Sequence, residues 1–180
     1  MSTREDMKRF YGMDLDFGTL GLQKPDRDMV YFCTPEGAEP AGSLGVDGIH
    51  FVLLPGDERV FCVDPSMMSP AYVLPVAEDF RTFLSYLLSC KDANVLSQIS
   101  WMSREQYRDL LNEDENARYP GWEEAAAKKR EALSEMEKEF HLTPQDPFDA
   151  VKTLQAAFDP SPIRWSDEYY DVLGMEREEE

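Results

Sequence analysis

The stretch DGIHFVLLPGDERVFCVDPSMMSPAYVLPVAEDFRTFLSYLLSC, residues 47–90, holds the densest apolar sequence in the chain. Residues 49–54 form an apolar run whose only polar member is His50, a composition typical of a strand covered on both faces. Residues 59–63 form a second run of similar length, and the turn-forming sequence PGDE separates the two. A loop this short joins antiparallel neighbours, so the pattern predicts a β-hairpin at the centre of the fold.

The second half of the stretch predicts an edge strand and then a helix. Residues 72–74 allow only a short strand, because Pro70 and Pro75 each lack the backbone N–H that a ladder bond requires. Glu78 and Asp79 place negative charge where a helix dipole favours it, at the start of a helix. The apolar side chains of this helix recur at helical spacing, and we expect them to dock on the hairpin: Phe80, Phe83, Leu84, Leu87 and Leu88.

Four sequence phrases resemble a known family: YFCTPEG (31–37), GVDGIHFVLLPG (45–56), VFCVDP (60–65) and YVLPVAEDFRTFL (72–84). They are similar to bacterial members of the SUKH superfamily, which also includes yeast cell-wall-assembly regulators, over roughly residues 29–111. The resemblance implies an α+β domain whose central, mainly antiparallel sheet is flanked by helices. It also implies protein binding, since many bacterial members are immunity proteins that neutralise toxins and others are protein-interaction modules.

The sequence before the central stretch predicts a helix, a strand and a long connection. Thr3 with Asp6 resembles a capping box, which predicts a helix over residues 4–11. Residues 30–34 predict a strand that joins the hairpin, and the glycines and prolines of residues 35–48 predict a connection. Its GSLGVDG segment does not qualify as a phosphate loop, because it leads into a strand and lacks a Lys-Ser or Lys-Thr pair.

The sequence after the central stretch is rich in helix signals. Asp92 is predicted to cap a short helix, and Ser103 with Gln106 forms the capping box of the next one. A long amphipathic helix follows. Asp146 as a cap and Pro147 at the first helical position then predict a further helix, with apolar side chains on one face.

The long amphipathic helix is predicted over residues 122–140, and its apolar stripe can either pack on the domain or pair with a second copy of the chain. Packing on the domain is favoured, because the stripe is shorter than the roughly three to four heptads typical of a coiled coil. We therefore expect a monomer in which residues 116–175 form a helical extension packed on a SUKH-like α+β domain of residues 1–115. Residues 176–180 form an acidic tail that we expect to be mobile.

The charge balance is strongly acidic. The chain has 18 basic and 36 acidic residues, a formal net charge of −18 at pH 7. Contacts with a nucleic-acid backbone need a basic footprint, so the charge disfavours nucleic acid as a partner. The interpretations that remain are a well-solvated surface, an electrostatic match to a basic partner, or mimicry of a polyanion.

Composition and cysteine usage predict the location. No segment approaches the roughly 20 apolar residues of a membrane helix, and the opening MSTREDMKRFYG lacks the apolar centre of a signal peptide. Cys33, Cys62 and Cys90 lack metal-motif spacing, as expected for buried thiols in a reducing compartment. We expect a cytoplasmic protein without membrane contact.

Residues typical of catalysis are scarce. His50 and His141 are the two histidines, and neither belongs to a pair at metal-ligand spacing. His50 with Cys62 offers a base and a nucleophile, but a strand histidine bonded to the backbone or to a carboxylate is the simpler interpretation. No nucleotide, flavin or dinucleotide fingerprint appears. We expect no catalytic residue, no metal and no cofactor.

The functional prediction is a surface that binds a protein. An occluding inhibitor needs acidic groups that steer a basic partner toward it and aromatic side chains that hold the complex. The hairpin turn, the loop of residues 64–72 and the entrance to the following helix offer this mixture. The candidate partner-binding residues are Asp57, Glu58, Asp64, Tyr72, Glu78 and Asp79.

The first hypothesis is therefore an immunity protein that neutralises a basic toxin domain by stoichiometric binding, without catalysis. Two alternatives stay open at this point. One is a regulatory or adaptor domain that binds a cellular protein, and the other is an unrecognised hydrolase with an acidic site. Toxicity of the partner when it is expressed alone separates the first two, and turnover that one carboxylate substitution removes would identify the third.

Overall fold

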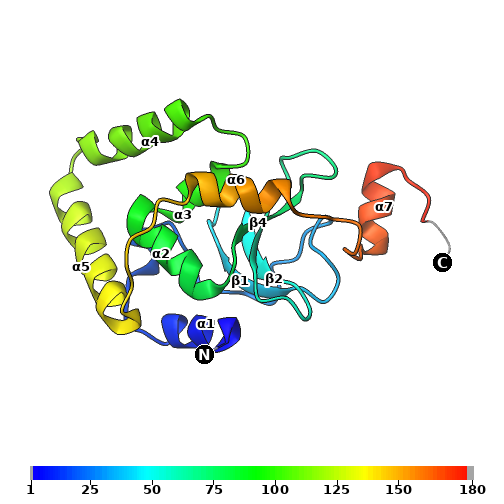
Figure 1. Cartoon of the computed structure of the whole chain (residues 1–180), viewed down its shortest axis with the longest axis horizontal. Coiled ribbons are helices and arrows are strands. Elements are labelled where there is room, and N and C mark those ends of the chain that lie inside the picture. Colours follow the sequence, from blue (N-terminus) through cyan, green and yellow to red (C-terminus); the bar gives the residue numbers. More distant parts are fainter. Residues whose placement is uncertain (1, 178–180) are drawn as a thin grey trace.

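The computed structural model describes residues 2–177 and shows an α+β fold, the class that the sequence predicts. A four-stranded sheet lies at the centre, with helices before and after it in the chain (Figure 1). The elements in order are α1 (Thr3–Tyr11), the 3-10 helix η1 (Phe17–Leu20), β1 (Glu39–Ser43), β2 (His50–Leu53), β3 (Val60–Val63), β4 (Val73–Ala77), α2 (Phe80–Cys90), α3 (Ala93–Gln98), α4 (Arg104–Asn116), α5 (Trp122–Phe140), α6 (Phe148–Ala156) and α7 (Asp167–Leu173).

The sheet has the strand order β1-β2-β3-β4, and every neighbouring pair is antiparallel. The predicted hairpin is confirmed as β2 and β3, with Leu53 opposite Val60 at the turn. β4 lies at an edge, as predicted, and continues past Pro75 to Ala77. The Gln155 side chain of α6 donates a hydrogen bond to the Pro75 carbonyl at 3.2 Å, so α6 covers the edge that β4 would otherwise expose.

The first strand does not lie where the sequence predicts it. Residues 30–34 form turns, with the Thr34 amide donating to the Tyr31 carbonyl at 2.8 Å. β1 lies instead within the predicted connection of residues 35–48 and pairs with β2. Its sequence EPAGS has a low strand preference, so pairing along the free edge of the hairpin, and not local propensity, decides its conformation. Gly42 lies at the register shift of this strand and has a φ of 133°, a backbone angle that residues with a side chain rarely adopt.

α1 begins one residue earlier than predicted, and Ser2 rather than Thr3 is its cap. The Ser2 hydroxyl accepts a hydrogen bond from the Glu5 amide, and the Glu5 carboxylate accepts one from the Ser2 amide. Thr3 has a tertiary role: its hydroxyl donates to the Glu58 carbonyl at 2.7 Å and accepts from the Phe80 amide at 3.1 Å. This one buried side chain therefore joins α1, the β2–β3 turn and the start of α2.

The main core lies between one face of the sheet and the helices α1, α2 and α5. Phe83 of α2 is fully buried, and its ring packs edge-to-face on Phe51 of β2 at a centroid distance of 5.1 Å. α5 reaches the same core with the buried part of its predicted stripe. The α5 side chains in this cluster are Ala132, Leu133, Met136 and Phe140.

The opposite face of the sheet is covered by irregular segments. Side chains alternate along β3, so Val60 and Cys62 face the main core whereas Phe61 and Val63 face a second cluster. The loop before β1 and the C-terminal segment close this second cluster, and α7 lies at the end of the molecule away from α5 (Figure 1). The covering side chains are Phe32, Cys33, Tyr72, Phe158, Ile163, Trp165, Tyr169, Tyr170 and Leu173.

Most helix starts in the second half of the chain are where the sequence predicts them. Asp92 and Ser103 cap α3 and α4, the second through the predicted capping box. α6 begins one residue later than predicted, with Pro147 as its cap residue. The Asp146 carboxylate still serves this helix start, because it accepts a hydrogen bond from the Phe148 amide at 2.9 Å.

The C-terminal segment contains a helix that the sequence analysis did not predict. α7 follows Ser166, and Gly174 ends it with a φ of 63°. The predicted acidic tail of residues 176–180 lies for the most part outside the described residues. Within residues 2–177, no helix is both long and apolar enough to cross a membrane.

Candidate functional site

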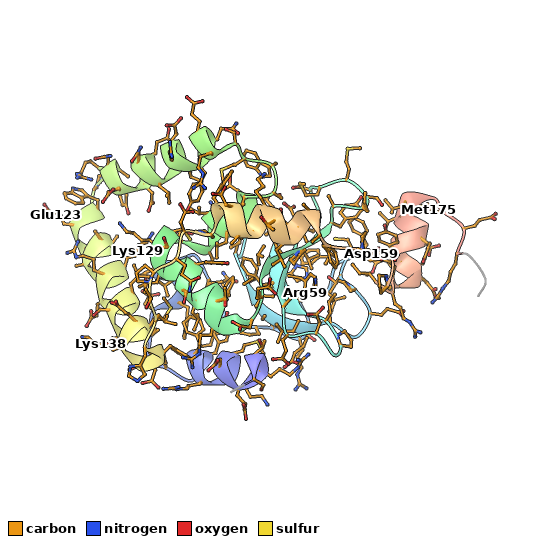
Figure 2. All side chains as sticks on the ribbon, viewed as in Figure 1. Arg59, Glu123, Lys129, Lys138, Asp159 and Met175 are labelled. Carbon is orange, nitrogen blue, oxygen red and sulfur yellow. The ribbon has the colours of Figure 1, made fainter. Side chains whose placement is uncertain are left out.

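A cleft of about 540 Å³ opens beside the β2–β3 turn. Three segments that are far apart in the sequence form its walls: residues 35–37 before β1, residues 54–59 around the turn, and residues 158–164 between α6 and α7. Figure 2 labels Arg59 and Asp159, which come from two of these walls. Because its walls are so distant in sequence, the cleft exists only in the folded chain.

Arg59 is the most constrained charged group in the cleft. Its guanidinium forms an ion pair with Asp57, with Nε 3.1 Å from both carboxylate oxygens and one terminal nitrogen 2.6 Å from Oδ2. The same guanidinium lies over the rings of Phe61 and Phe158, at 5.1 and 5.4 Å from the ring centroids. Arg59 therefore links the hairpin turn to the C-terminal segment.

The ion pair also changes the protonation of Asp57. Partial burial alone would raise the pKa of Asp57, but the hydrogen bonds and charge of Arg59 outweigh it and hold that pKa below its ordinary value. The pKa of Arg59 is raised, first by its hydrogen bonds to Asp57. Because the carboxylate is stabilised in the folded state, this contribution to stability is present at neutral pH and is lost as the pH falls through the lowered pKa of Asp57.

The other charged groups of the cleft are exposed. Glu36, Asp159 and Arg164 lie on its rim, and the Glu36 amide donates to the Arg164 carbonyl at 2.9 Å. The walls between them are apolar and partly buried, with Leu54 and Ile163 among them. The cleft thus combines apolar contact area with a rim that selects by charge, which is typical of a binding site.

The structure places four of the predicted partner-binding residues at one end of the sheet. Val60 pairs with Ala77, so the β2–β3 turn and the β4–α2 connection lie side by side. Asp57 lines the cleft, as described above. Glu58 accepts a hydrogen bond from the Thr3 amide at 2.8 Å, so its carboxylate also supports the start of α1.

Glu78 and Asp79 differ in their roles at this same end. Asp79 is the cap of α2, and its carboxylate accepts a hydrogen bond from the Thr82 amide at 2.7 Å. Glu78 is exposed, and its charge contributes to the raised pKa of Arg59. Of these two acidic residues, Glu78 is therefore the one whose side chain is presented to solvent beside the turn.

Asp64 and Tyr72 lie at the opposite end of the β3–β4 pair, since Val63 pairs with Val73 there. The Asp64 carboxylate accepts hydrogen bonds from the Ser66 amide at 2.9 Å and the Ser66 hydroxyl at 2.6 Å. Tyr72 is only 7% exposed. The structure therefore does not bring these two residues together with the other four, and both contribute to the internal packing of their loop.

Several residues of the cleft had no signal in the sequence. Phe158 lies just beyond the end of α6 and packs on Phe61 at a centroid distance of 5.4 Å. Arg59 was assigned only to a strand, and Arg164 was not singled out. Phe158 contacts Phe61 and Arg59 from nearly a hundred positions away, and a local pattern cannot show such contacts.

The three cysteines are free and buried, as predicted. Burial raises the pKa of Cys33 to about 11 and that of Cys90 to about 12, and it raises the pKa of Cys62 further. All three side chains are therefore neutral thiols at physiological pH. Among residues 2–177, no group of three or more His, Cys, Asp or Glu side chains is arranged to hold a metal ion.

His50 has hydrogen-bond partners at both ring nitrogens. Nδ1 lies 2.7 Å from the Gly48 carbonyl, to which it donates, and Nε2 lies 3.1 Å from the Thr34 hydroxyl. The Thr34 hydroxyl also accepts a hydrogen bond from the Tyr31 amide at 2.9 Å. His50 thus holds the loop before β1 against β2, which is the structural role that the sequence analysis favoured.

We expect the pKa of His50 to lie below the ordinary value of 6.5, because burial disfavours its charged form. The unfolded chain then binds a proton more readily than the folded chain, so this histidine lowers stability as the pH falls below the ordinary histidine pKa. An NMR titration measures this pKa, with His141→Gln assigning the signal. A His50 pKa above 6.5 would contradict the burial argument.

Comparison with known proteins finds no family model, no curated protein and no solved structure that matches this chain.

Proposed function

We propose that this chain is a non-catalytic protein-binding domain, and that it acts as an immunity protein that neutralises a toxin by stoichiometric binding. The observation that carries the proposal is the cleft beside the β2–β3 turn, whose apolar walls and exposed carboxylates belong to a chain with a net charge of −18. The resemblance to the SUKH superfamily supports the same function. The three neutral thiols are consistent with action in the cytoplasm, where thiols stay reduced.

The proposed partner is a basic protein. Charged groups on the rim of an interface mainly accelerate the encounter, and desolvated apolar contacts then slow dissociation. Glu36 and Glu78 are exposed acidic groups near Arg59, and they supply the charge that accelerates the encounter. The partly buried Leu54 and Ile163 of the cleft supply the apolar contacts that slow dissociation.

Affinity capture from the native lysate, followed by mass identification, is expected to recover a basic partner. Stopped-flow association with that partner is expected to slow by roughly an order of magnitude between about 20 mM and 500 mM salt. The double reversal Glu36→Lys with Glu78→Lys is expected to slow it by a similar factor. We choose these two residues because Asp57, Glu58 and Asp79 have internal partners whose loss would also disturb the fold.

The matched control is the pair Glu123→Lys with Glu135→Lys on α5. Both residues are exposed, and Figure 2 shows Glu123 at the end of the molecule away from Arg59. The control makes the same change in net charge, so it separates a local effect at the cleft from a general effect of charge. Equal rates for the wild type and both double variants, or a rate indifferent to salt, would exclude the cleft as the docking site for a basic partner.

A further inference from the structure

A second surface of interest lies around Tyr169, which is buried at the junction of three segments. Its ring stacks on Trp165 at a centroid distance of 4.2 Å and lies nearly parallel to Phe32 at 6.5 Å. It meets Tyr72 edge-on at 6.1 Å. Its hydroxyl lies 3.2 Å from the Ser69 hydroxyl. Tyr169 therefore holds α7 against the loop before β1 and against the loop before β4.

These same segments leave large apolar side chains exposed. Val172 (56% exposed) lies on α7 and Met175 (53%) follows it (Figure 2), and we call these two side chains, with the acidic residues of α7, the α7 patch. Val30 (64%) and Met68 (80%) lie on the two loops that Tyr169 contacts. Single exposed apolar residues are ordinary, but several on adjoining segments are typical of an interaction surface.

The charge of α7 indicates what can cover this patch. Glu168, Asp171 and Val172 share one face of the helix by their spacing of three and four residues, and all three are exposed. Asp167 adds a further carboxylate at the start of the helix, and it is paired with Arg177 at 2.6 Å. On the outer face of α7, Val172 thus lies beside Glu168 and Asp171, acidic groups that form no salt bridge within residues 2–177.

We infer that the α7 patch docks a basic amphipathic segment of the protein partner. The apolar side chains of that segment contact Val172 and Met175, and its Lys or Arg side chains lie beside Glu168 and Asp171. A second copy of this chain is a poor occupant, because two identical acidic faces would repel each other. One segment of the chain joins the two surfaces, since residues 158–164 line the cleft and lead directly into α7. The inference rests on the proposed protein-binding function.

The test uses the full chain and a labelled helical peptide of about 18 residues, made of leucine and lysine with leucine at helical spacing. Two comparison peptides are a scrambled sequence of the same composition and a version with glutamate in place of lysine. Fluorescence anisotropy measures binding to the wild type and to the double variant Val172→Ser with Met175→Ser. Tyr119→Ser is the matched control, because Tyr119 is a 54% exposed apolar residue on the α4–α5 connection.

The wild type is expected to bind the leucine-lysine peptide more tightly than either comparison peptide. The double variant is expected to weaken that binding at least tenfold while its urea melt is unchanged, and Tyr119→Ser is expected to leave the affinity within about twofold. No binding by the wild type, or equal binding by both variants, would overturn the inference. So would a dimer of the wild type that the double variant dissociates, because the patch would then be a self-association surface.

The two proposals fail separately. If the native partner is captured through the cleft but the peptide does not bind, the docking role of the α7 patch is rejected and the proposed protein-binding function still stands. If the peptide binds through the patch but the captured partner is not neutralised, the immunity function is rejected and the docking role of the patch still stands.

Discussion

Replacing Phe83 with alanine is expected to lower the free energy of unfolding by about 3 to 5 kcal/mol, the usual cost of emptying a buried aromatic site. Phe83 is fully buried, packs on Phe51 of β2 and stacks on Phe80 at a centroid distance of 5.5 Å. The substitution removes contacts between α2 and the sheet, and Thr3 holds the start of α2 in place, so the void cannot close easily. Urea unfolding followed by circular dichroism measures the change.

Leu88→Ala is the control for Phe83→Ala, because Leu88 lies on the same helix but is only partly buried. Its loss is expected to stay below about 2 kcal/mol, in proportion to the smaller area that it buries. A loss below about 1 kcal/mol for Phe83→Ala itself would show that the contact between α2 and the hairpin is not the centre of the core.

Tyr169→Ala is expected to lower the free energy of unfolding by about 3 kcal/mol. Tyr169 is 4% exposed and contacts aromatic rings from three segments, so its removal detaches α7 from the second face of the sheet. Limited proteolysis is expected to cut the Tyr169→Ala variant near α7 sooner than the wild type. Urea melts give the change in stability.

Tyr169→Phe separates the ring from its hydroxyl. It keeps the aromatic contacts and removes only the hydrogen bond to Ser69, so the expected loss is about 1 kcal/mol. If the alanine and phenylalanine variants were equally stable, the ring would contribute nothing and Tyr169 would not hold the C-terminal segment in place.

The parts of the fold that the sequence predicted correctly are those that local chemistry decides. The hairpin follows from two apolar runs joined by a four-residue turn sequence, and α2 follows from Asp79 and its apolar stripe. The boundaries of α5, Trp122 and Phe140, were also predicted correctly, because a break precedes it and the stripe ends there. In each of these elements the residues that determine the structure lie within the element itself.

The parts that the sequence could not predict depend on distant contacts. β1 has a poor strand sequence and is formed by pairing with β2, whereas residues 30–34 have strand-like residues but cover the second cluster. The candidate site shows the same limit. Asp57 was singled out for its exposure in a turn, but its partner Arg59 and the opposite wall at Phe158 become visible only when the chain is folded.

The acidic turn residues illustrate why composition alone overestimates a binding surface. Glu58 and Asp79 resemble steering charges in the sequence, yet each accepts a hydrogen bond from a backbone amide at a helix start. Such carboxylates stabilise the fold whether or not a partner exists. Glu36 and Glu78, whose side chains are exposed, are the better candidates for contact with a partner.

Expression of the captured partner, alone and together with this chain, tests the proposed immunity function most directly. The partner alone is expected to arrest growth, and the wild-type chain is expected to restore growth when the two are produced together. Titration of the purified partner's toxic activity should end at one chain per partner, and the Glu36→Lys with Glu78→Lys variant should protect poorly. A partner that is harmless when expressed alone would instead identify an adaptor, and neutralisation by far less than one equivalent of the chain would identify an enzyme.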